Sequence, residues 1–273
     1  MFWLHTLITH YDFHITAIMA TVNKSTPYKI PNRRSTVQTV TNTRPNVGMV
    51  RPSMGMVLCS RVGNEILYGL VKRRYGYGMQ DILKSNFYDE TCFTEICDVE
   101  RAALLHICSK GENWENVYAK LWTESMWNKD TCSFEYTYSI NKFIENKDRI
   151  ATIIKSTKSL FPKGIWGFPK GRPERGETDI SCAIRETMEE TLVSNVSVLP
   201  IDAQFESYKL WNYKYFVGAV QAIDASDRVI ENNPEISSVM WCNLDHALKL
   251  IPKDATDKKR VLTKINALAS KML

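Results

Sequence analysis

Three glutamates stand at helical spacing in the second half of this 273-residue chain: Glu186, Glu189 and Glu190. Residues three and four apart share a helix face, so the three carboxylates can point the same way. Like charges so placed repel by roughly a few tenths of a kcal/mol per pair. A chain that keeps them together needs a compensating cation, and converging oxygen ligands suit Mg²⁺ or Mn²⁺. The alternative is a solvated acidic helix face.

A glycine turn and a spaced carboxylate precede these glutamates. Residues 165–171 read IWGFPKG, a short apolar strand that ends in a Pro/Gly turn. The order that follows resembles the Nudix box, in which Gly, Glu, Arg-Glu, Glu-Glu and a closing apolar residue stand at fixed intervals. The residues in register are Gly171, Glu177, Arg185, Glu186, Glu189, Glu190 and Val193.

Two positions depart from that pattern. Thr187 stands where an aliphatic residue is usual, and Leu192 replaces the closing glycine. Neither position is a metal ligand of the family. Leu192 bears on how the helix ends, because the usual glycine supplies a left-handed cap without Cβ strain.

The resemblance implies an α/β fold, the Nudix α/β/α sandwich with a mixed sheet. Apolar runs at 54–62 and 65–74 flank Gly63-Asn64 and predict a β-hairpin. Further strands are expected at 196–199, 206–211, 213–222 and 239–242, and helices at 244–250 and 256–273. We therefore predict a Nudix domain made of residues 54–78 and 160–273.

Residues 79–159 differ in character from the sequence on either side. Apolar positions recur at helical spacing in 99–107 and 114–122, and a further helix is expected within 139–154. The stretch is too long for a plain loop, so we interpret it as a mostly helical insertion and an RNA-binding lobe. Residues 1–53 are polar and basic and predict a flexible arm, either phosphate-seeking or an ordinary loose terminus.

The resemblance also implies roles for the box residues. Glu186, Glu189 and Glu190 would hold Mg²⁺ or Mn²⁺, together with the backbone carbonyl of Lys170, and Glu190 would matter most. Arg185 would brace a glutamate and belongs, with Glu189 and Glu190, to the expected catalytic set. Glu177 and Gly171 would support the metal ligands without binding the metal themselves.

Outside the box, Glu235 resembles a catalytic base. Residues 234–241 read PEISSVMW, which is similar to a pattern of mRNA-decapping Nudix enzymes that contains this base. Glu206 and Glu231 are its rivals, and a surface glutamate is the alternative. The segment 166–171 and the helical block before the box are similar to decapping enzymes of large DNA viruses.

That resemblance implies hydrolysis of the 5′ cap pyrophosphate of mRNA, releasing 7-methylguanosine diphosphate and 5′-monophosphate RNA. The partner would be capped mRNA, and the setting the host-cell cytoplasm, as in viral host shutoff. One alternative is a Nudix hydrolase of diphosphoinositol polyphosphates or dinucleoside polyphosphates. Another is a non-catalytic RNA- or protein-binding module, against which the intact box acids argue.

Capped RNA would need a positive track and an aromatic platform. The expected phosphate-binding residues are Lys72, Arg73, Arg74 and Lys170. The cap base is cationic and planar, so it favours stacking on aromatic rings. The candidates, none singled out, are Tyr75, Tyr77, Trp211 and Tyr213.

Composition limits the partners and the cellular compartment that fit this chain. The net charge of +5 fits an acidic partner without requiring one, and an odd number of cysteines, seven, favours a reducing compartment. A zinc site at Cys92, Cys97, His106 and Cys108 matches no common spacing, so buried cysteines are the better interpretation. Residues 1–22 resemble neither a membrane span nor a signal peptide, and Met19 is a second possible start.

Overall fold

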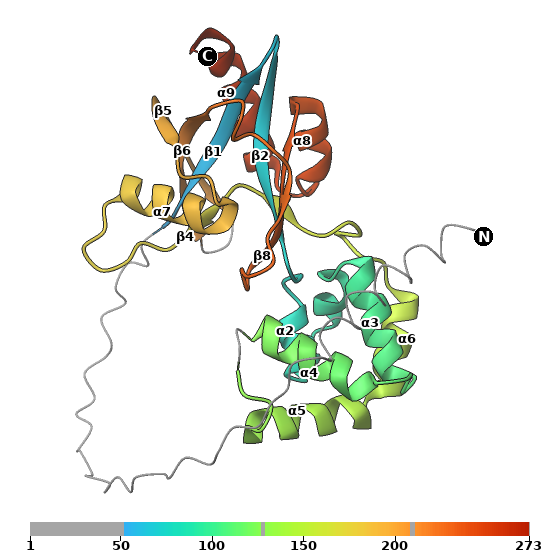
Figure 1. The fold of residues 1–273 in the computed structure, drawn as a ribbon. Coiled ribbons are helices and arrows are strands. Elements are labelled where there is room, and N and C mark those ends of the chain that lie inside the picture. Colours follow the sequence, from blue (N-terminus) through green and yellow to red (C-terminus); the bar gives the residue numbers. More distant parts are fainter. Residues whose placement is uncertain (1–51, 127–128, 208–210, 273) are drawn as a thin grey trace, which may run out of the picture. The chain divides into compact units, whose positions relative to one another are not determined.

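The computed structural model describes residues 52–126, 129–207 and 211–272, without the side chains of 201–212 and of residue 272 (Figure 1). The expected arm at 1–53 lies outside these residues except for its last two positions, and so does the possible start at Met19.

A long β-hairpin opens the described chain, as predicted. Its strands are β1 (Ser53–Val62) and β2 (Glu65–Arg73), which pair antiparallel. Gly63 turns the chain at φ 60°, a backbone conformation that glycine adopts without steric cost. The strands that follow the box are β5 (Val196–Ser207) and β6 (Trp211–Val220). They form a second antiparallel pair. The separate strand expected at 206–211 is wrong, because residues 206–207 end β5 and residue 211 begins β6.

The central sheet is mixed. Its strands run in the order β5-β6-β1-β2-β8-β7, where β7 is Arg228–Val229 and β8 is Ile236–Cys242. The β1–β6 pair is parallel and the other pairs are antiparallel. Two short strands, β3 (Trp166–Gly167) and β4 (Lys170–Gly171), add to β2 and β1 and carry the segment that leads into the box.

Helices cover both faces of this sheet (Figure 1). Alternate residues of β1 face opposite ways: Met56 and Leu58 pack in a cluster with Ala183 of helix α7 (Asp179–Thr191). Val57 and Cys59 belong to a second cluster, with side chains of α8 (Leu244–Leu250) and α9 (Thr256–Met272). Because β1 is buried on both faces, it reads as a continuous apolar run. The α/β sandwich with a mixed sheet is confirmed.

The helices between the hairpin and β3 have a hydrophobic cluster of their own, which includes Trp122, Tyr118 and Phe143. The elements are α2 (Met79–Leu83), η1 (Glu90–Thr94), α3 (Asp98–Cys108), α4 (Trp114–Ser125), α5 (Phe134–Glu145) and α6 (Lys147–Ser156). The single helix expected within 139–154 is therefore two helices. Asn146 separates them, and its side chain bonds the Lys142 carbonyl, which gives the backbone an alternative to continuing the helix.

Within the described ranges, every helix is too short or too polar to cross a membrane.

Candidate active site

Helix α7 carries the box glutamates and begins with a strong cap. The Thr178 hydroxyl accepts the Ser181 N–H, and the Ser181 hydroxyl accepts the Thr178 N–H. Thr187, which departs from the family pattern, is buried and donates to the Ala183 carbonyl at 2.7 Å. Its hydroxyl is thus satisfied inside the core, which removes most of the cost of burying it.

The helix ends at Leu192 in the left-handed region, with φ 59° and ψ 19°. This is the conformation that the usual glycine adopts without strain. For a residue with a Cβ it costs about 1–2 kcal/mol. Leu192 therefore keeps the backbone geometry of the helix end but lowers the stability of the fold. Its side chain is largely exposed.

Arg185 connects the acids on the more open side of α7. Its Nε and Nη2 bind the two carboxylate oxygens of Glu177 at 2.9 and 3.0 Å. Its Nη1 lies 2.8 Å from Glu186 Oε1 and 3.2 Å from Glu189 Oε2, and Nη2 also donates to the Arg172 carbonyl. The Arg185 hydrogen bonds lower the pKa of Glu177 to about 2.

Glu186 lies directly against Gly171 in β4. A Cβ built on Gly171 would stand 1.9–2.1 Å from the carboxylate atoms of Glu186. Any side chain at position 171 would therefore displace that carboxylate, which explains the glycine by close approach. Burial raises the pKa of Glu186, and Arg185 acts in the opposite direction.

Glu190 faces the interior of the molecule. It is 7% exposed, and its Oε2 accepts the backbone N–H of Lys170 at 3.1 Å. Burial raises the pKa of Glu190 to about 8, against the opposing charge of Lys170. Burial in turn lowers the pKa of Lys170. Within the described residues Glu190 makes no ion pair, and the charge of Lys170 offsets its burial only in part.

The loop before β8 holds Glu235 in place through Asn233. The Asn233 side-chain oxygen accepts the backbone N–H groups of Glu235 and Ile236, each at 2.8 Å. Its Nδ2 donates to the Glu189 carbonyl at 3.0 Å. One amide side chain therefore ties this loop to the last turn of α7.

Arg74 holds the same loop from the other side. Its backbone N–H donates to the Glu235 carbonyl at 2.7 Å. Its guanidinium donates, over 2.6–3.1 Å, to the carbonyls of Ile230, Glu231, Asn233 and Ile236. Arg74 therefore supports this loop, and its expected contact with substrate phosphate stays a prediction.

Of the three glutamates considered for the base, Glu235 stands beside the box. Its charge contributes to raising the pKa of both Glu186 and Glu190, so the three carboxylates face a common region. Glu231 is exposed, and only its carbonyl takes part in the contacts of the loop. The side chain of Glu206 lies outside the described residues.

The oxygen donors fit a hard divalent ion in type. Among the described residues, no three His, Cys, Asp or Glu side chains already enclose a metal position. The carboxylates of Glu186 and Glu190 and the backbone carbonyls of β4 are nevertheless the ligands that Mg²⁺ and Mn²⁺ prefer. Buried Glu190 is the decisive observation, because a bound cation would add to the partial compensation that Lys170 gives it. Glu189 is more than half exposed and contacts Arg185.

The zinc alternative does not hold. Cys92 packs in the helical cluster, Cys97 caps the start of α3, and the His106 ring bonds the Glu112 carbonyl. Cys108 is also buried in that cluster. The four side chains make no common metal group in the described part of the chain.

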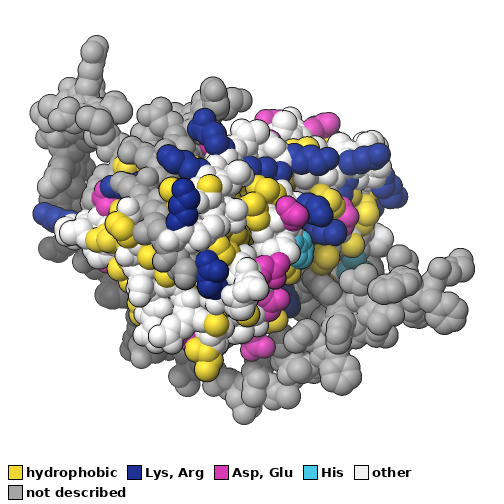
Figure 2. Space-filling view, turned by 90° about the horizontal axis from the view of Figure 1, so that it is seen from above, with side chains coloured by type: hydrophobic (Ala, Val, Ile, Leu, Met, Phe, Trp, Pro, Cys, Tyr) yellow, Lys and Arg dark blue, Asp and Glu magenta, His cyan; other side chains and the backbone are white. Residues whose placement is uncertain are grey.

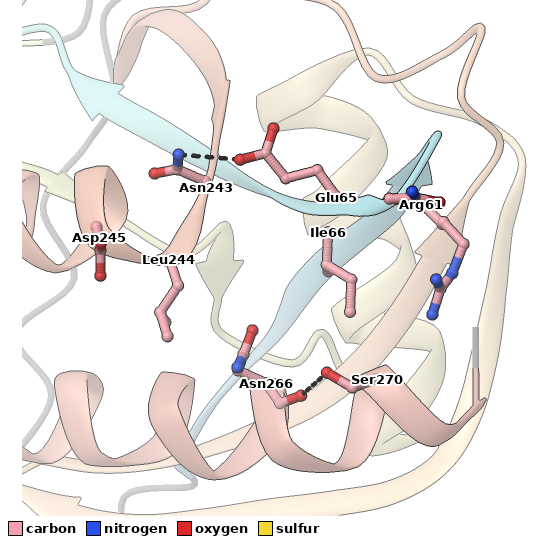
Figure 3. A pocket seen from close by; sticks show the side chains of 9 residues that line it. Arg61, Glu65, Ile66, Asn243, Leu244, Asp245, Asn266 and Ser270 are labelled. Atoms are coloured by element: carbon pink, nitrogen blue, oxygen red, sulfur yellow. Dashed lines mark hydrogen bonds between the residues drawn. The ribbon is translucent and has the colours of Figure 1, made fainter.

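A polar pocket of about 430 Å³ lies at the start of β2, at the end of the strand that is remote from the Glu235 loop (Figure 3). Asn243 donates to Glu65 at 3.1 Å and Ser270 donates to the Asn266 carbonyl at 2.7 Å. At about 3.3 Å per residue, the nine residues of β2 put roughly 30 Å between this pocket and the Glu235 loop. None of its lining residues was expected in the site.

The other cations expected to bind phosphate lie over aromatic rings. The Lys72 amine is 6.0 Å from the Trp166 ring centroid, and the Arg73 guanidinium is 5.0 Å from that of Tyr77. Figure 2 shows Lys and Arg side chains spread over the visible face with acidic side chains between them. The basic excess is therefore distributed on that face.

The sequence alone assigned no role to Asn233, and it offered Lys258 only as one of several basic residues of a final helix that could bind RNA. Asn233 had a usable signal, since Asn two residues before a strand-entry glutamate is typical of a side-chain-capped turn. Lys258 had none, because one lysine on a lysine-rich helix looks like any other until the packing of α9 is known.

Comparison with known proteins agrees with this geometry. Residues 137–265 match the model of the NUDIX domain. The fold and the box are those of the Nudix superfamily, a family that generally uses divalent metal. The chain belongs to the Nudix superfamily.

The relatives include viral proteins. An Acanthamoeba polyphaga mimivirus protein, provisionally described as an mRNA-decapping protein, is 25% identical over 74% of this chain; the chain spans 65% of its length, less than two thirds. The mRNA-decapping protein g5R of African swine fever virus is 21% identical over 75% of this chain and 89% of its own. A Pelagibacter ubique RNA pyrophosphohydrolase is 27% identical over 39% of this chain and 75% of its own.

Among solved structures, a C. elegans Ap4A hydrolase aligns with 80% of this chain and 98% of its own at 14% identity, with a TM-score of 0.42. A likeness at that level carries no conclusion about substrate.

Proposed function

We propose that this protein is an mRNA-decapping hydrolase that uses Mg²⁺ or Mn²⁺ and releases 7-methylguanosine diphosphate and 5′-monophosphate RNA. The observation that carries the proposal is the extent of the likeness to the viral relatives. Their matches cover 74–75% of the chain, whereas the NUDIX model covers residues 137–265 alone. The shared sequence therefore extends beyond the catalytic domain.

The carboxylates support the chemical step. Bound metal would screen the phosphates and activate water, and Glu186, Glu189 and Glu190 with the Lys170 carbonyl would hold it. Glu235 would accept a proton from the attacking water as its oxygen bonds to phosphorus. The bridging P–O bond then breaks, and the electron pair leaves with the diphosphate or the RNA phosphate.

The surrounding residues would keep that arrangement in place. Arg185 and Glu177 would orient Glu186 and Glu189 through the ion pairs described above. Asn233 and Arg74 would hold Glu235 at the edge of the site. The cytoplasm is the expected setting, because capped mRNA is translated there and the odd cysteine count suits a reducing compartment.

A product assay tests the proposal. Purified protein with Mg²⁺ or Mn²⁺ receives cap-labelled RNA and, separately, a diphosphoinositol polyphosphate. Labelled 7-methylguanosine diphosphate from the RNA supports decapping. Turnover of the inositol compound alone would favour a small-substrate hydrolase, and product from neither would favour a binding module.

A matched pair of variants in one loop tests the base. Glu235→Gln is expected to lower turnover by about 100-fold or more, within the usual range for a general base. Glu231→Gln, four residues earlier and exposed, is expected to keep wild-type turnover. Equal activity of the two variants would remove Glu235 from the mechanism.

A further inference from the structure

Three cations from three separate elements converge beside the carboxylates. Lys258 comes from α9, Arg73 from the end of β2 and Lys170 from β4. The Lys258 amine lies over β3, only 3.5 Å from where a Cβ on Gly167 would stand. Arg73 and Lys170 are close enough for their charges to act on Lys258. The fold thus gathers like charges that are far apart in the sequence.

Within the described part of the chain, these cations form no ion pair with a carboxylate. The Nε of Arg73 is buried and has no hydrogen-bond partner there. Burial lowers the pKa of Lys258 to about 8, with Lys170 and Arg73 acting in the same direction. The charge of Asp254 acts on Lys258 in the opposite direction and offsets the burial only in part. Cations that lose solvent without an ion pair are costly, and a bound anion would relieve that cost.

This cluster of Lys258, Arg73 and Lys170 adjoins the carboxylates. The Lys170 backbone N–H bonds Glu190, and the Lys170 side chain feels the charges of Glu190, Glu235 and Glu186. A substrate with several phosphates could therefore reach from the carboxylates, where metal would bind, to the cations. The carboxylates would thus bind cations, and the neighbouring cluster of Lys258, Arg73 and Lys170 would bind anions.

The aromatic rings beside the cluster already face protein cations. The Arg73 guanidinium lies 5.0 Å from the ring centroid of Tyr77, and the Lys170 amine lies 5.7 Å from that of Tyr213. The cap base carries a positive charge, so three neighbouring cations would repel it. Phosphate, rather than the cap base, is the part of capped RNA whose charge fits here.

We propose that Lys258, Arg73 and Lys170 form an anion subsite that holds the 5′-terminal phosphate of the RNA, which is the RNA side of the scissile pyrophosphate. The proposal rests on the proposed decapping function for the identity of the ligand. A small polyphosphate offers the same chemistry from another source, and the experiment separates the two.

Binding of product RNA tests the subsite without catalysis. The probe is a short labelled RNA with a 5′-monophosphate, compared with the same RNA ending in a 5′-hydroxyl, with the full chain in EDTA. Lys258→Met is expected to weaken binding of the 5′-phosphate RNA about tenfold and the 5′-hydroxyl RNA less. It should also lower the slope of log K against log salt by about 0.7, the value for one lost contact to single-stranded RNA.

Two further variants give the comparison its control. Lys264→Met removes an exposed lysine of the same helix and is expected to change affinity less than twofold. Lys258→Arg keeps the charge and should retain most of the binding. If Lys258→Met unfolds, Lys258→Gln takes its place. Wild-type affinity of Lys258→Met, or of Lys258→Gln in its place, for the 5′-phosphate RNA would overturn the proposal.

The outcome is separate from that of the decapping assay. If wild-type protein fails to decap while Lys258→Met still loses 5′-phosphate binding, the subsite stands and the proposed function falls. If wild-type protein decaps RNA while Lys258→Met binds 5′-phosphate RNA as wild type does, the proposed function stands and the subsite falls. A diphosphoinositol polyphosphate in the same titration completes the test: loss of its binding alone would overturn the assignment to RNA.

Discussion

The two sides of α7 place glutamates in opposite environments. On the open side, Arg185 binds both oxygens of Glu177 and lowers the pKa of that carboxyl to about 2. On the inner side, burial raises the pKa of Glu190 to about 8. The residue type is the same, and the difference comes from a bound arginine on one side and lost solvent on the other.

The open side of α7 is held by Arg185, whereas the inner side, with Glu190, would be stabilised by a cation. The open side is balanced by its own arginine, so it can serve as a rigid support. The inner side has a carboxylate whose ionised form is unfavourable unless a positive charge arrives. Changes on the inner side should therefore affect the chemistry most, and changes on the open side should affect how well the metal is held.

The largest effect is expected from Glu190→Gln. The change keeps shape and removes the charge that would hold metal, so turnover should fall by at least about 10³-fold, while RNA binding stays near wild type. Steady-state hydrolysis of cap-labelled RNA and a binding titration measure the two properties. Wild-type turnover in this variant would show that the inner side of α7 is not the reactive one.

A smaller loss is expected from Glu177→Gln on the open side. Removing a residue that orients metal ligands typically costs 10–100-fold in metal affinity or activity. Titration of Mn²⁺ against activity measures it. Glu174→Gln, an exposed glutamate three residues earlier, serves as the control and should have no effect. Equal behaviour of the two variants would mean that the bracing is not used.

The same contrast predicts opposite pH effects on stability. A raised pKa at Glu190 means that its contribution in metal-free protein is present below pH 4.5 and is lost as pH rises toward 8. Melting temperature in EDTA should therefore fall between pH 5 and 7.5. The melting temperature of Glu190→Gln should fall less over this pH range. Added Mg²⁺ should reduce the fall in wild-type protein.

The lowered pKa of Glu177 gives the opposite sign. Its contribution is present above pH 4.5 and is lost as pH falls toward 2. Acid unfolding of wild-type protein and of Glu177→Gln measures this contribution. A variant with wild-type acid stability would contradict the ion pair as a source of stability.

The smallest effect concerns the end of the helix. Leu192→Gly is expected to raise the free energy of unfolding by about 1 kcal/mol, because glycine adopts the left-handed conformation without strain. Chemical denaturation measures it. The pH slope of Glu190 should stay unchanged, since burial and not helix stability sets that pKa. A destabilised variant would show that the Leu192 side chain makes contacts worth more than the strain.

A local sequence pattern predicts the structure correctly where one pattern alone decides it. The hairpin around Gly63, the helix that carries Glu186 to Glu190 and the strand after Glu235 follow from periodicity and turn residues. The prediction fails where two local signals compete. Asn146 divides one expected helix into two, and the strand expected at 206–211 is shared between the end of β5 and the start of β6.

By itself, the sequence determined the identity of the oxygen donors and their order along the chain, because fixed spacing on a helix sets which carboxylates can share a face. Only the tertiary structure decided which of them is buried, which is braced and which cations stand opposite. Long-range packing places Arg74 against the Glu235 loop and Lys258 beside Arg73 and Lys170. Burial and counter-charge are properties of the folded surroundings, and no local spacing contains them.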